Sequence, residues 1–316
     1  MSPQIRTPAD ATFLRMNRVY ALALALTTAL SLRAQVTREV FLDADTANEV
    51  DDLYAIVRAF AEPGWRIPVL ASAQWQASQW ATANTAEDSY RLNEHLAAHL
   101  GVSDSTEVVR GAHRRMYDWG HQAVHSHAAH ELLALAEGRS PDDPLTVVAL
   151  GALTNVASAL FIDPTLAERI ELWWLGSTYD FDAQRRGLTD FNAVMDPQAA
   201  RLVLEHPTLR THVLPVSEVG EHTVSFDEVS AAVGDDHPLA QLLTDRWLEH
   251  MDGSRGTRVL WDLALIELMS DPGLATEVEA PGYYGANVTA YRDLEGEALF
   301  ARALARIGGH LEKLPE

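Results

Sequence analysis

Five carboxylate side chains fall within ten residues of this chain, in the segment Asp43-Ala-Asp-Thr-Ala-Asn-Glu-Val-Asp-Asp52. Carboxylates this close together repel one another unless a positive partner lies among them. A metal ion is the simplest partner of that kind. The 316-residue chain has no cysteine, which excludes thiolate ligands and disulfides. Carboxylate, amide and carbonyl oxygens suit hard cations, and several carboxylates on a loop with adjustable geometry favour calcium over magnesium.

The acidic segment stands between two stretches with different patterns. Arg38–Leu42 is a short apolar run typical of a buried strand, and residues 53–61 have the apolar spacing of a packed helix. In open α/β sheets, sites are built where strands end and helices begin. Acidic residues also favour the N-terminus of a helix. That preference would explain the Asp-Asp pair at the helix start, but it does not explain Asp43 and Asp45 at the end of a strand.

Strand-like runs alternate with helix-like stretches along the rest of the chain. This order predicts right-handed βαβ units and a largely parallel sheet. We expect strands at 67–71, 106–110, 145–150, 170–175 and 211–215, helices at 86–100, 130–137 and 197–205, and a loop near residue 180. Residues 36–316 are therefore predicted to form a single α/β domain with a mostly parallel, Rossmann-like central sheet flanked by helices.

Four motifs resemble, in the same order, those of the nucleoside hydrolase family of the inosine-uridine preferring type. The acidic segment is similar to the family's opening strand, Asp-x-Asp, turn and Asp-Asp pair. Gly151-Ala-Leu-Thr-Asn155 resembles the family's Gly-Pro-Leu-Thr-Asn turn. Asp190-Phe-Asn-Ala-Val-Met-Asp-Pro197 resembles its Glu-Phe-Asn segment with a following Asp-Pro. Trp261-Asp-Leu-Ala264 resembles its late His-Asp-Pro-x-Ala motif. The resemblance runs from about Glu39 onward. It implies an N-glycosyl hydrolase that splits a ribonucleoside into ribose and a nucleobase.

The resemblance also implies a role for individual residues. The implied ligands of Ca2+ are Asp45, Asp52, Asp262 and the backbone carbonyl of Thr154. Asp45 would also be the general base for the attacking water, whose pKa the metal would lower. Asp51 would bind the ribose 2′ hydroxyl, and Asp190 and Asn192 would bind the far side of the sugar. The transition state would carry positive charge on the ribose.

Departures from the family pattern concern the leaving base and the acidic turn. The turn holds five residues instead of three, so Asn48 is an additional candidate for contact with the metal or the sugar. Trp261 stands where many members carry a histidine that protonates the leaving base. His125 is the first candidate for a replacement acid, and Tyr117 is the second. Stacking of the base on Trp261, or on Trp75 at the end of a strand, is the alternative to protonation.

Two other functions stay open at this point. One is a ribose-binding or nucleoside-binding protein that keeps the metal and has lost turnover, which the tryptophan at the position of the acid would explain. The other is a metal-dependent phosphoesterase that uses the same acidic loop. No phosphate-binding glycine-rich loop and no arginine cluster around the motifs is evident in the sequence, which argues against the phosphoesterase.

The N-terminal region and the charge balance bear on location and partners. Val19–Leu32 is uncharged and mostly apolar, follows a short basic start, and is too short for a comfortable membrane span. We expect residues 1–35 to be a signal peptide region with an upstream extension, and the protein to be exported without a stable membrane anchor. A net charge of −21 disfavours nucleic acid as a partner. The expected partner is a small-molecule nucleoside or riboside, and a homo-oligomer stays open.

Overall fold

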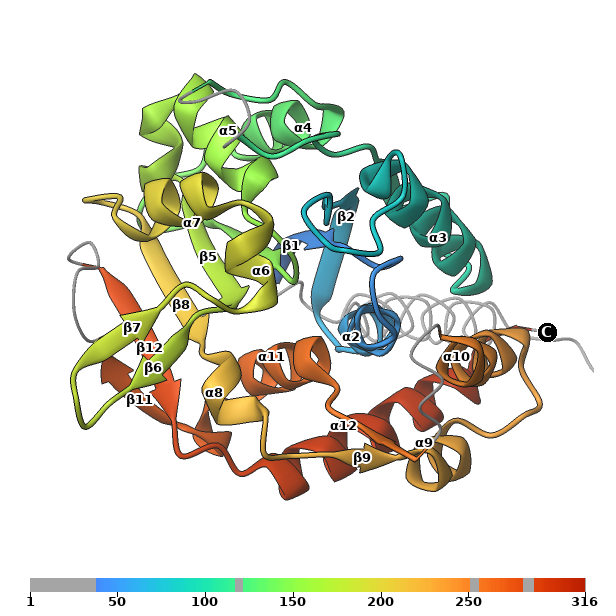
Figure 1. Ribbon diagram of the computed structural model, residues 1–316. Helices are drawn as coiled ribbons and strands as arrows, with labels where there is room; N and C mark the ends of the chain where they lie inside the picture. Colours follow the sequence, from blue (N-terminus) through green and yellow to red (C-terminus); the bar gives the residue numbers. More distant parts are fainter. Residues whose placement is uncertain (1–37, 117–121, 251–255, 281–286, 316) are drawn as a thin grey trace, which may run out of the picture. The chain divides into compact units, whose positions relative to one another are not determined.

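A mostly parallel sheet of eight strands lies at the centre of the structure (Figure 1). The computed structural model describes residues 38–116, 122–250, 256–280 and 287–315. Neighbouring strands follow one another in the order β11 (Thr276–Glu279), β12 (Val288–Arg292), β8 (Arg210–Leu214), β5 (Ile170–Leu175), β4 (Leu145–Ala149), β1 (Arg38–Ala44), β2 (Trp65–Ser72) and β3 (Glu107–Val109). Only β11 pairs antiparallel to its neighbour within this sheet. The predicted fold class is confirmed.

Helices bury both faces of the sheet. Successive residues of a strand point to opposite faces, so Leu42 of β1 packs into one apolar core and Phe41 into the other. The first core is closed by α2 (Asp51–Phe60), α3 (Thr85–His99), α9 (Phe226–Val233), α10 (Pro238–Glu249), α11 (Trp261–Ser270) and α12 (Gly296–Leu311). The second is closed by α4 (His127–Leu135), α5 (Thr154–Ile162) and α7 (Pro197–Leu204). Burial on both faces explains why the central strands are apolar throughout rather than alternating.

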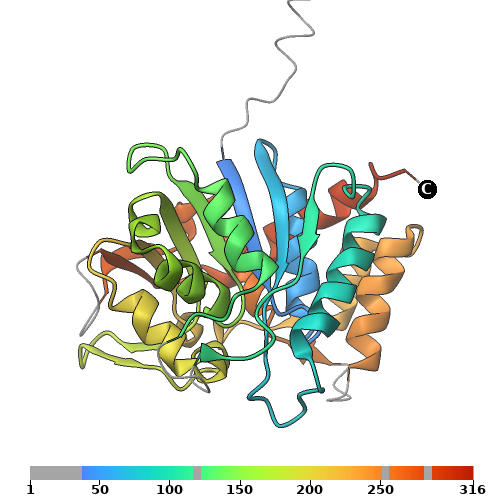
Figure 2. The same ribbon diagram turned by 90° about the horizontal axis from the view of Figure 1, so that it is seen from above.

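The strand order places the acidic segment in a crevice. The chain passes from β1 to β2 and β3 on one side, and then crosses back to β4 on the other side of β1. This is the strand order of a Rossmann sheet, in which ligands bind at the carboxyl ends of the strands where the direction reverses. Asp45 directly follows β1 and Leu150 directly follows β4. Figure 2 shows that the loop between β2 and α3 projects from this same edge of the sheet.

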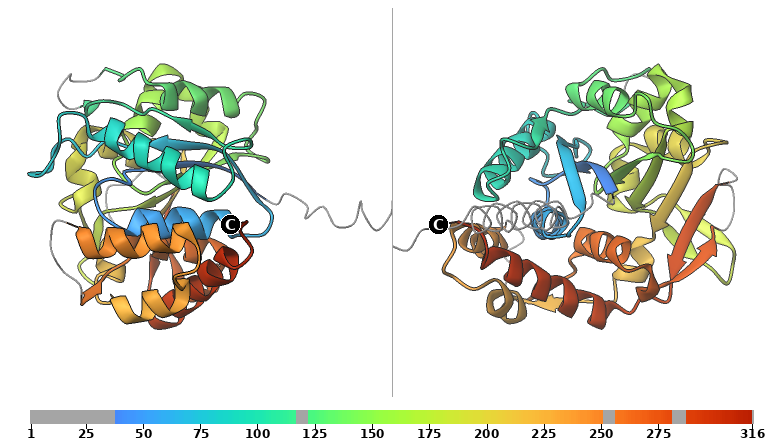
Figure 3. Two further views of the ribbon diagram at one scale, coloured as in Figure 1. Left: turned by 90° about the vertical axis from the view of Figure 1, so that its right-hand side faces the viewer. Right: turned by 180° about the vertical axis from the view of Figure 1, so that it is seen from behind.

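The later part of the chain differs most from the sequence-based expectation. The predicted loop near residue 180 is a hairpin of two short strands, β6 (Thr178–Asp180) and β7 (Arg185–Gly187). Short helices α6 (Phe191–Met195) and α8 (Val216–Val219) and the strand pair β9 (Val224–Ser225) and β10 (Thr257–Arg258) were not anticipated either. The same is true of β11 and β12, which form one edge of the central sheet. Figures 1 and 3 show α11 beside α2, on the same face of the sheet.

Residues 1–37 lie outside the described residues, so the predicted signal peptide stays a prediction. The same holds for the boundary of the predicted domain at residue 36. In the part of the chain that the structure describes, no helix is both long enough and apolar enough to cross a membrane.

Candidate active site

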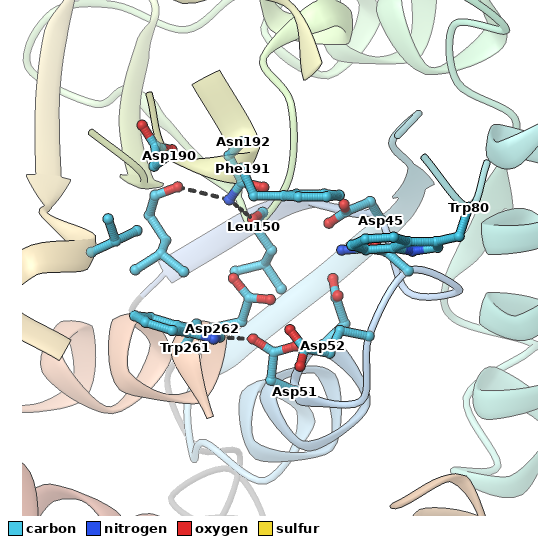
Figure 4. Close-up of a pocket in the computed structure, with 14 residues that line it drawn as sticks. Asp45, Asp51, Asp52, Trp80, Leu150, Asp190, Phe191, Asn192, Trp261 and Asp262 are labelled. Carbon is cyan, nitrogen blue, oxygen red and sulfur yellow. Dashed lines mark hydrogen bonds between the residues drawn. The ribbon is translucent and has the colours of Figure 1, made fainter. Parts of the chain in front are cut away.

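A cavity of about 310 Å³ opens at the carboxyl edge of the sheet (Figure 4). Its lining comes from the turn after β1, the loop after β2, the ends of β4 and β5, and the first turns of α2, α6, α8 and α11. The lining residues are Asp45, Asn48, Glu49, Asp51, Asp52, Trp80, Leu150, Leu175, Asp190, Phe191, Asn192, Val216, Trp261 and Asp262. Acidic side chains form its floor, and aromatic side chains form its walls.

Carboxylates from distant parts of the sequence meet at the floor of the cavity. Asp51 and Asp52 begin α2, and Asp262 is the second residue of α11. One carboxylate oxygen from each of these three side chains lies within 4.8 Å of the other two. The backbone N–H of Asp262 also donates a hydrogen bond to the Asp51 carboxylate, at 3.2 Å. Both helices therefore direct their N-termini, which favour negative charge, at the same point.

The hydrogen bonding of these carboxylates is incomplete in a way that fits a cation. Asp45, Asp52 and Asp262 each bury one carboxylate oxygen that has no hydrogen-bond partner among the described residues. A buried charge without a partner is costly, and a divalent cation between these oxygens would supply one. The three side chains are those that the sequence analysis assigned to the metal. Asp51 lies close enough to be a further ligand.

Burial and mutual repulsion perturb the acidic groups strongly. Burial raises the pKa of Asp45 to about 8, with repulsion from Asp51 as the next cause. Burial and then the neighbouring carboxylates raise the pKa values of Asp52 and Asp262 well above the usual range. Without a cation, the floor of the cavity therefore retains protons near neutral pH. Cation binding would displace those protons.

Close packing behind Asp45 depends on a glycine and an asparagine. A Cβ atom at Gly151 would come within 2.6 Å of the Asp45 carboxylate, so only glycine leaves room for this side chain. Asn155 donates its amide to the Asp43 carboxylate, at 2.9 Å, and to the Ser72 carbonyl, at 3.1 Å. Asn155 thus holds the ends of β1 and β2 to α5, and its partner Asp43 does not line the cavity.

Asn192 and Asp190 lie on the opposite rim, at the start of α6. The Asn192 amide donates to the carbonyls of Leu150, at 2.5 Å, and Leu175, at 3.0 Å, and so spans the ends of β4 and β5. Asp190 caps α6 by accepting a hydrogen bond from the Ala193 N–H, at 3.1 Å. Its other oxygen is buried and has no hydrogen-bond partner among the described residues. Both residues line the cavity, as the sequence analysis expected of residues at the site.

Thr154 does not line the cavity, although its carbonyl was assigned to the metal. It begins α5, and its hydroxyl donates to the buried Asp196 carboxylate at 2.8 Å. Leu150 lines the cavity instead. The position of Leu150 in the sequence could have indicated this, because Leu150 is the first residue after β4 and Thr154 lies four residues farther along the chain.

The aromatic walls also differ from the expectation. Trp80 and Phe191 stack with their ring centroids 5.9 Å apart, and the Trp80 indole N–H donates to the Asn48 side chain at 3.2 Å. Trp261 lines the cavity from the start of α11, next to Asp262. Trp75, in the first part of the β2–α3 loop, is only 3% exposed and packs with Ala152 and Met195, outside the cavity lining. The loop folds back after the strand, so its tip reaches the site and its first residues do not.

The structure does not bring His125, the first candidate acid, to the cavity. His125 is exposed, is not a lining residue, and lies with its Nδ1 3.1 Å from the Nε2 of His130. Tyr117 lies outside the described residues. In the longer acidic turn, Asn48 lines the cavity but its side-chain oxygen is bound to the Trp80 indole. Glu49 lies 3.6 Å from the guanidinium of Arg258.

Comparison with known proteins supports one family. A model of the family "Inosine-uridine preferring nucleoside hydrolase" matches residues 40–296. The chain is 25% identical over 223 residues to the protein of that name from Leishmania major, which covers 60% of this chain and 68% of the relative. For the Crithidia fasciculata protein of the same name, the identity is 24% over 185 residues, covering 52% of this chain and 56% of the relative.

Solved structures show the same fold. An inosine-guanosine nucleoside hydrolase aligns with a TM-score of 0.67 and 19% identity, covering 89% of this chain and 100% of that one. The plant nucleoside hydrolase PpNRh1 aligns with a TM-score of 0.66 and 18% identity, over 86% of this chain and 99% of that one. The type III effector protein XopQ, solved with adenosine diphosphate ribose, aligns with a TM-score of 0.68 and 14% identity, over 97% of this chain and 100% of that one.

Proposed function

Because this chain belongs to the inosine-uridine preferring nucleoside hydrolase family, whose members are N-glycosyl hydrolases, we propose that it hydrolyses ribonucleosides with bound Ca2+. The observation that carries this proposal is the set of buried carboxylate oxygens without hydrogen-bond partners among the described residues. They belong to Asp45 and Asp52 of the acidic segment and to the distant Asp262, and all three residues line one cavity.

Asp45, Asp52 and Asp262 would hold the cation, and Asp51, whose carboxylate meets those of Asp52 and Asp262, would be a further ligand. Leu150, which lines the same cavity, would offer its backbone carbonyl. Oxygen donors of this kind suit Ca2+, which accepts variable geometry. When bound, the cation supplies Lewis-acid chemistry, polarising hydroxyl groups and lowering the pKa of water.

The remaining chemistry falls to side chains around the ribose. Asp45 has one buried oxygen free of hydrogen bonds among the described residues, and this oxygen can accept a proton from the attacking water. Asp190 has a similar oxygen on the opposite rim, placed to accept a hydrogen bond from a sugar hydroxyl. The buried negative charge of the floor favours a transition state with positive charge on the ribose.

We propose that the leaving base is held by stacking rather than protonated by His125. Trp80, Phe191 and Trp261 supply flat aromatic surface in the lining, which contains no histidine, lysine or arginine among the described residues. An indole N–H can donate a hydrogen bond but is not an acid near neutral pH. A planar nucleobase matches these walls better than a nonaromatic leaving group does.

Assay of free ribose tests the proposal against its alternatives. Purified protein is incubated with a panel of nucleosides and nucleotides, with Ca2+ or with chelator, and Asp45→Asn is run in parallel. Ribose release that needs Ca2+ and is lost in the variant supports nucleoside hydrolysis. Calcium-dependent nucleoside binding without ribose would identify a binding protein. Release of phosphate from nucleotides would identify a phosphoesterase.

We also propose that the protein is exported. The basis is the apolar stretch Val19–Leu32, and the mature chain should then begin near Gln35 or Val36. N-terminal sequencing of the native protein checks this. Recovery of a chain that begins at Met1 or Met16 would reject it.

A further inference from the structure

A fully buried ion pair joins the two helices that carry the floor carboxylates. Arg58 lies on α2 and Glu267 lies on α11, and both side chains are 0% exposed. The Nε of Arg58 donates to Oε2 of Glu267 at 2.5 Å. At 1.5 Å per helical residue, the pair lies roughly 7–9 Å along the helices from Asp52 and Asp262.

The pair sits in apolar surroundings but is electrically compensated. Residues 55–57 and Ala59, on either side of Arg58, are buried apolar side chains. Arg58 also reaches Glu62 at 2.7 Å, and Glu267 forms a second ion pair with Arg302 of α12 at 2.7 Å. Buried ion pairs are weak sources of stability, since well-packed apolar residues of similar volume often replace them at no cost. Stability alone therefore does not account for this pair.

Carboxylates of the same two helices meet at their other end. One oxygen each of Asp51, Asp52 and Asp262 lies within 4.8 Å of the others, and in the ionised form that a cation requires these groups would push the helix ends apart. The opposing contact at this end is the hydrogen bond from the Asp262 N–H to Asp51, at 3.2 Å. The buried ion pair of Arg58 and Glu267, farther along the same helices, offsets that repulsion.

We propose that Arg58 and Glu267 are positioning residues that fix the separation and register of α2 and α11. They hold Asp52 and Asp262 where their oxygens meet one cation before the cation binds. The cation then does not have to draw the helices together, and its affinity is higher for that reason. This inference rests on the metal site of the proposed function, and it adds residues that touch neither metal nor substrate.

The main test removes both charges together. Arg58→Met/Glu267→Leu keeps the interior filled, and it leaves two ion pairs at the edge of the network intact, Glu62–Arg306 and Arg302–Asp271. Calcium affinity is measured by titration calorimetry, and the melting temperature is measured in chelator. We expect a melting temperature within a few degrees of wild type and a calcium dissociation constant raised by about 10–100-fold, the usual effect of losing support behind metal ligands. Unchanged affinity in the folded double variant would overturn the inference.

A second pair of variants covers the case in which the double variant does not fold. Glu267→Gln keeps the shape and leaves Arg58 paired with Glu62, but it removes the charge contact between the helices. Glu62→Gln is the matched control, because it removes the same charge from the same network one turn farther from the site. Calcium affinity should fall about tenfold or more in the first variant and change little in the second. Equal changes in both would mean that only net charge matters, and would overturn the inference.

The result separates this inference from the proposed function. Calcium titration needs no turnover, so a wild-type protein that binds calcium without releasing ribose still tests the positioning role. A wild-type protein that binds no divalent cation would overturn the metal site and the positioning role together.

Discussion

The stability of the metal-free protein should fall as the pH rises from 5 to 7. Burial raises the pKa of Asp45 to about 8, so the folded protein keeps this proton throughout that range. In the unfolded chain the same carboxyl has an ordinary pKa of about 3.9 and has lost its proton. The folded state therefore binds more protons than the unfolded state, and stability is lost as the pH increases.

The size of the effect follows from the same numbers. One extra proton in the folded state changes the unfolding free energy by about 1.4 kcal/mol for each pH unit, so Asp45 alone contributes ~3 kcal/mol between pH 5 and pH 7. Asp43, whose pKa burial raises to about 7, acts in the same direction. For a domain of this size, ~3 kcal/mol corresponds to a fall of roughly 6–12 °C in melting temperature.

The assay is thermal unfolding at pH 5, 6 and 7, in chelator and in saturating Ca2+. Calcium binds the ionised carboxylates of the folded protein, so the stabilisation that it gives should grow with pH. Asp45→Asn removes the titrating group while keeping its size, and it should flatten the slope in chelator by about 1.4 kcal/mol per pH unit. A melting temperature in chelator that is flat or rising from pH 5 to 7, or a slope that Asp45→Asn leaves unchanged, would refute this reasoning.

Three further predictions concern the metal ligands, the aromatic walls and the candidate acid His125. Asp52→Asn and Asp262→Asn should each weaken calcium binding and nearly abolish ribose release without unfolding the protein, as followed by calorimetry, turnover and circular dichroism. Trp80→Ala should lower kcat/KM for nucleosides about 5–150-fold, mainly through KM, because stacking on a base is worth ~1–3 kcal/mol. Trp80→Phe should retain most of the activity. Unchanged kcat/KM in both variants would show that Trp80 does not contact the base. His125→Ala should leave kcat on purine nucleosides close to wild type, because this side chain is exposed and lies outside the cavity lining; a large loss of kcat would restore His125 as the acid.

Local sequence patterns were sufficient for six of the eight strands of the central sheet and for the part of the acidic floor that follows β1, but β11 and β12 were not predicted. The strand from Arg38, the acidic turn and the helix from Asp51 are consecutive in the chain, so their relation is set by short-range periodicity and by where a strand ends. The predicted strand at 170–175 matches β5, and the strands at 67–71 and 145–150 match β2 and β4 within two residues. Parallel order then follows from the alternation of strands and helices.

Resemblance to the family was needed for Asp262, since nothing in its local sequence connects it with Asp45. The structure brings both to one cavity and adds Leu150, whose position depends on where β4 ends. It also shows that Trp80, and not Trp75, lines the cavity. The path of the loop that carries both tryptophans is set by contacts with Asn48 and Phe191, which lie 32 and 111 residues from Trp80 in the chain.

The sequence by itself determined which residue types could bind a hard cation and at which edge of a parallel sheet they would lie. Only the tertiary structure decided which of them meet, because side-chain direction and loop path depend on partners far away in the chain. Arg58 shows the difference most clearly. In the sequence it interrupts an apolar helix face, and only the packing of α2 against α11 supplies Glu267, 209 residues away, as the charge that makes its burial possible.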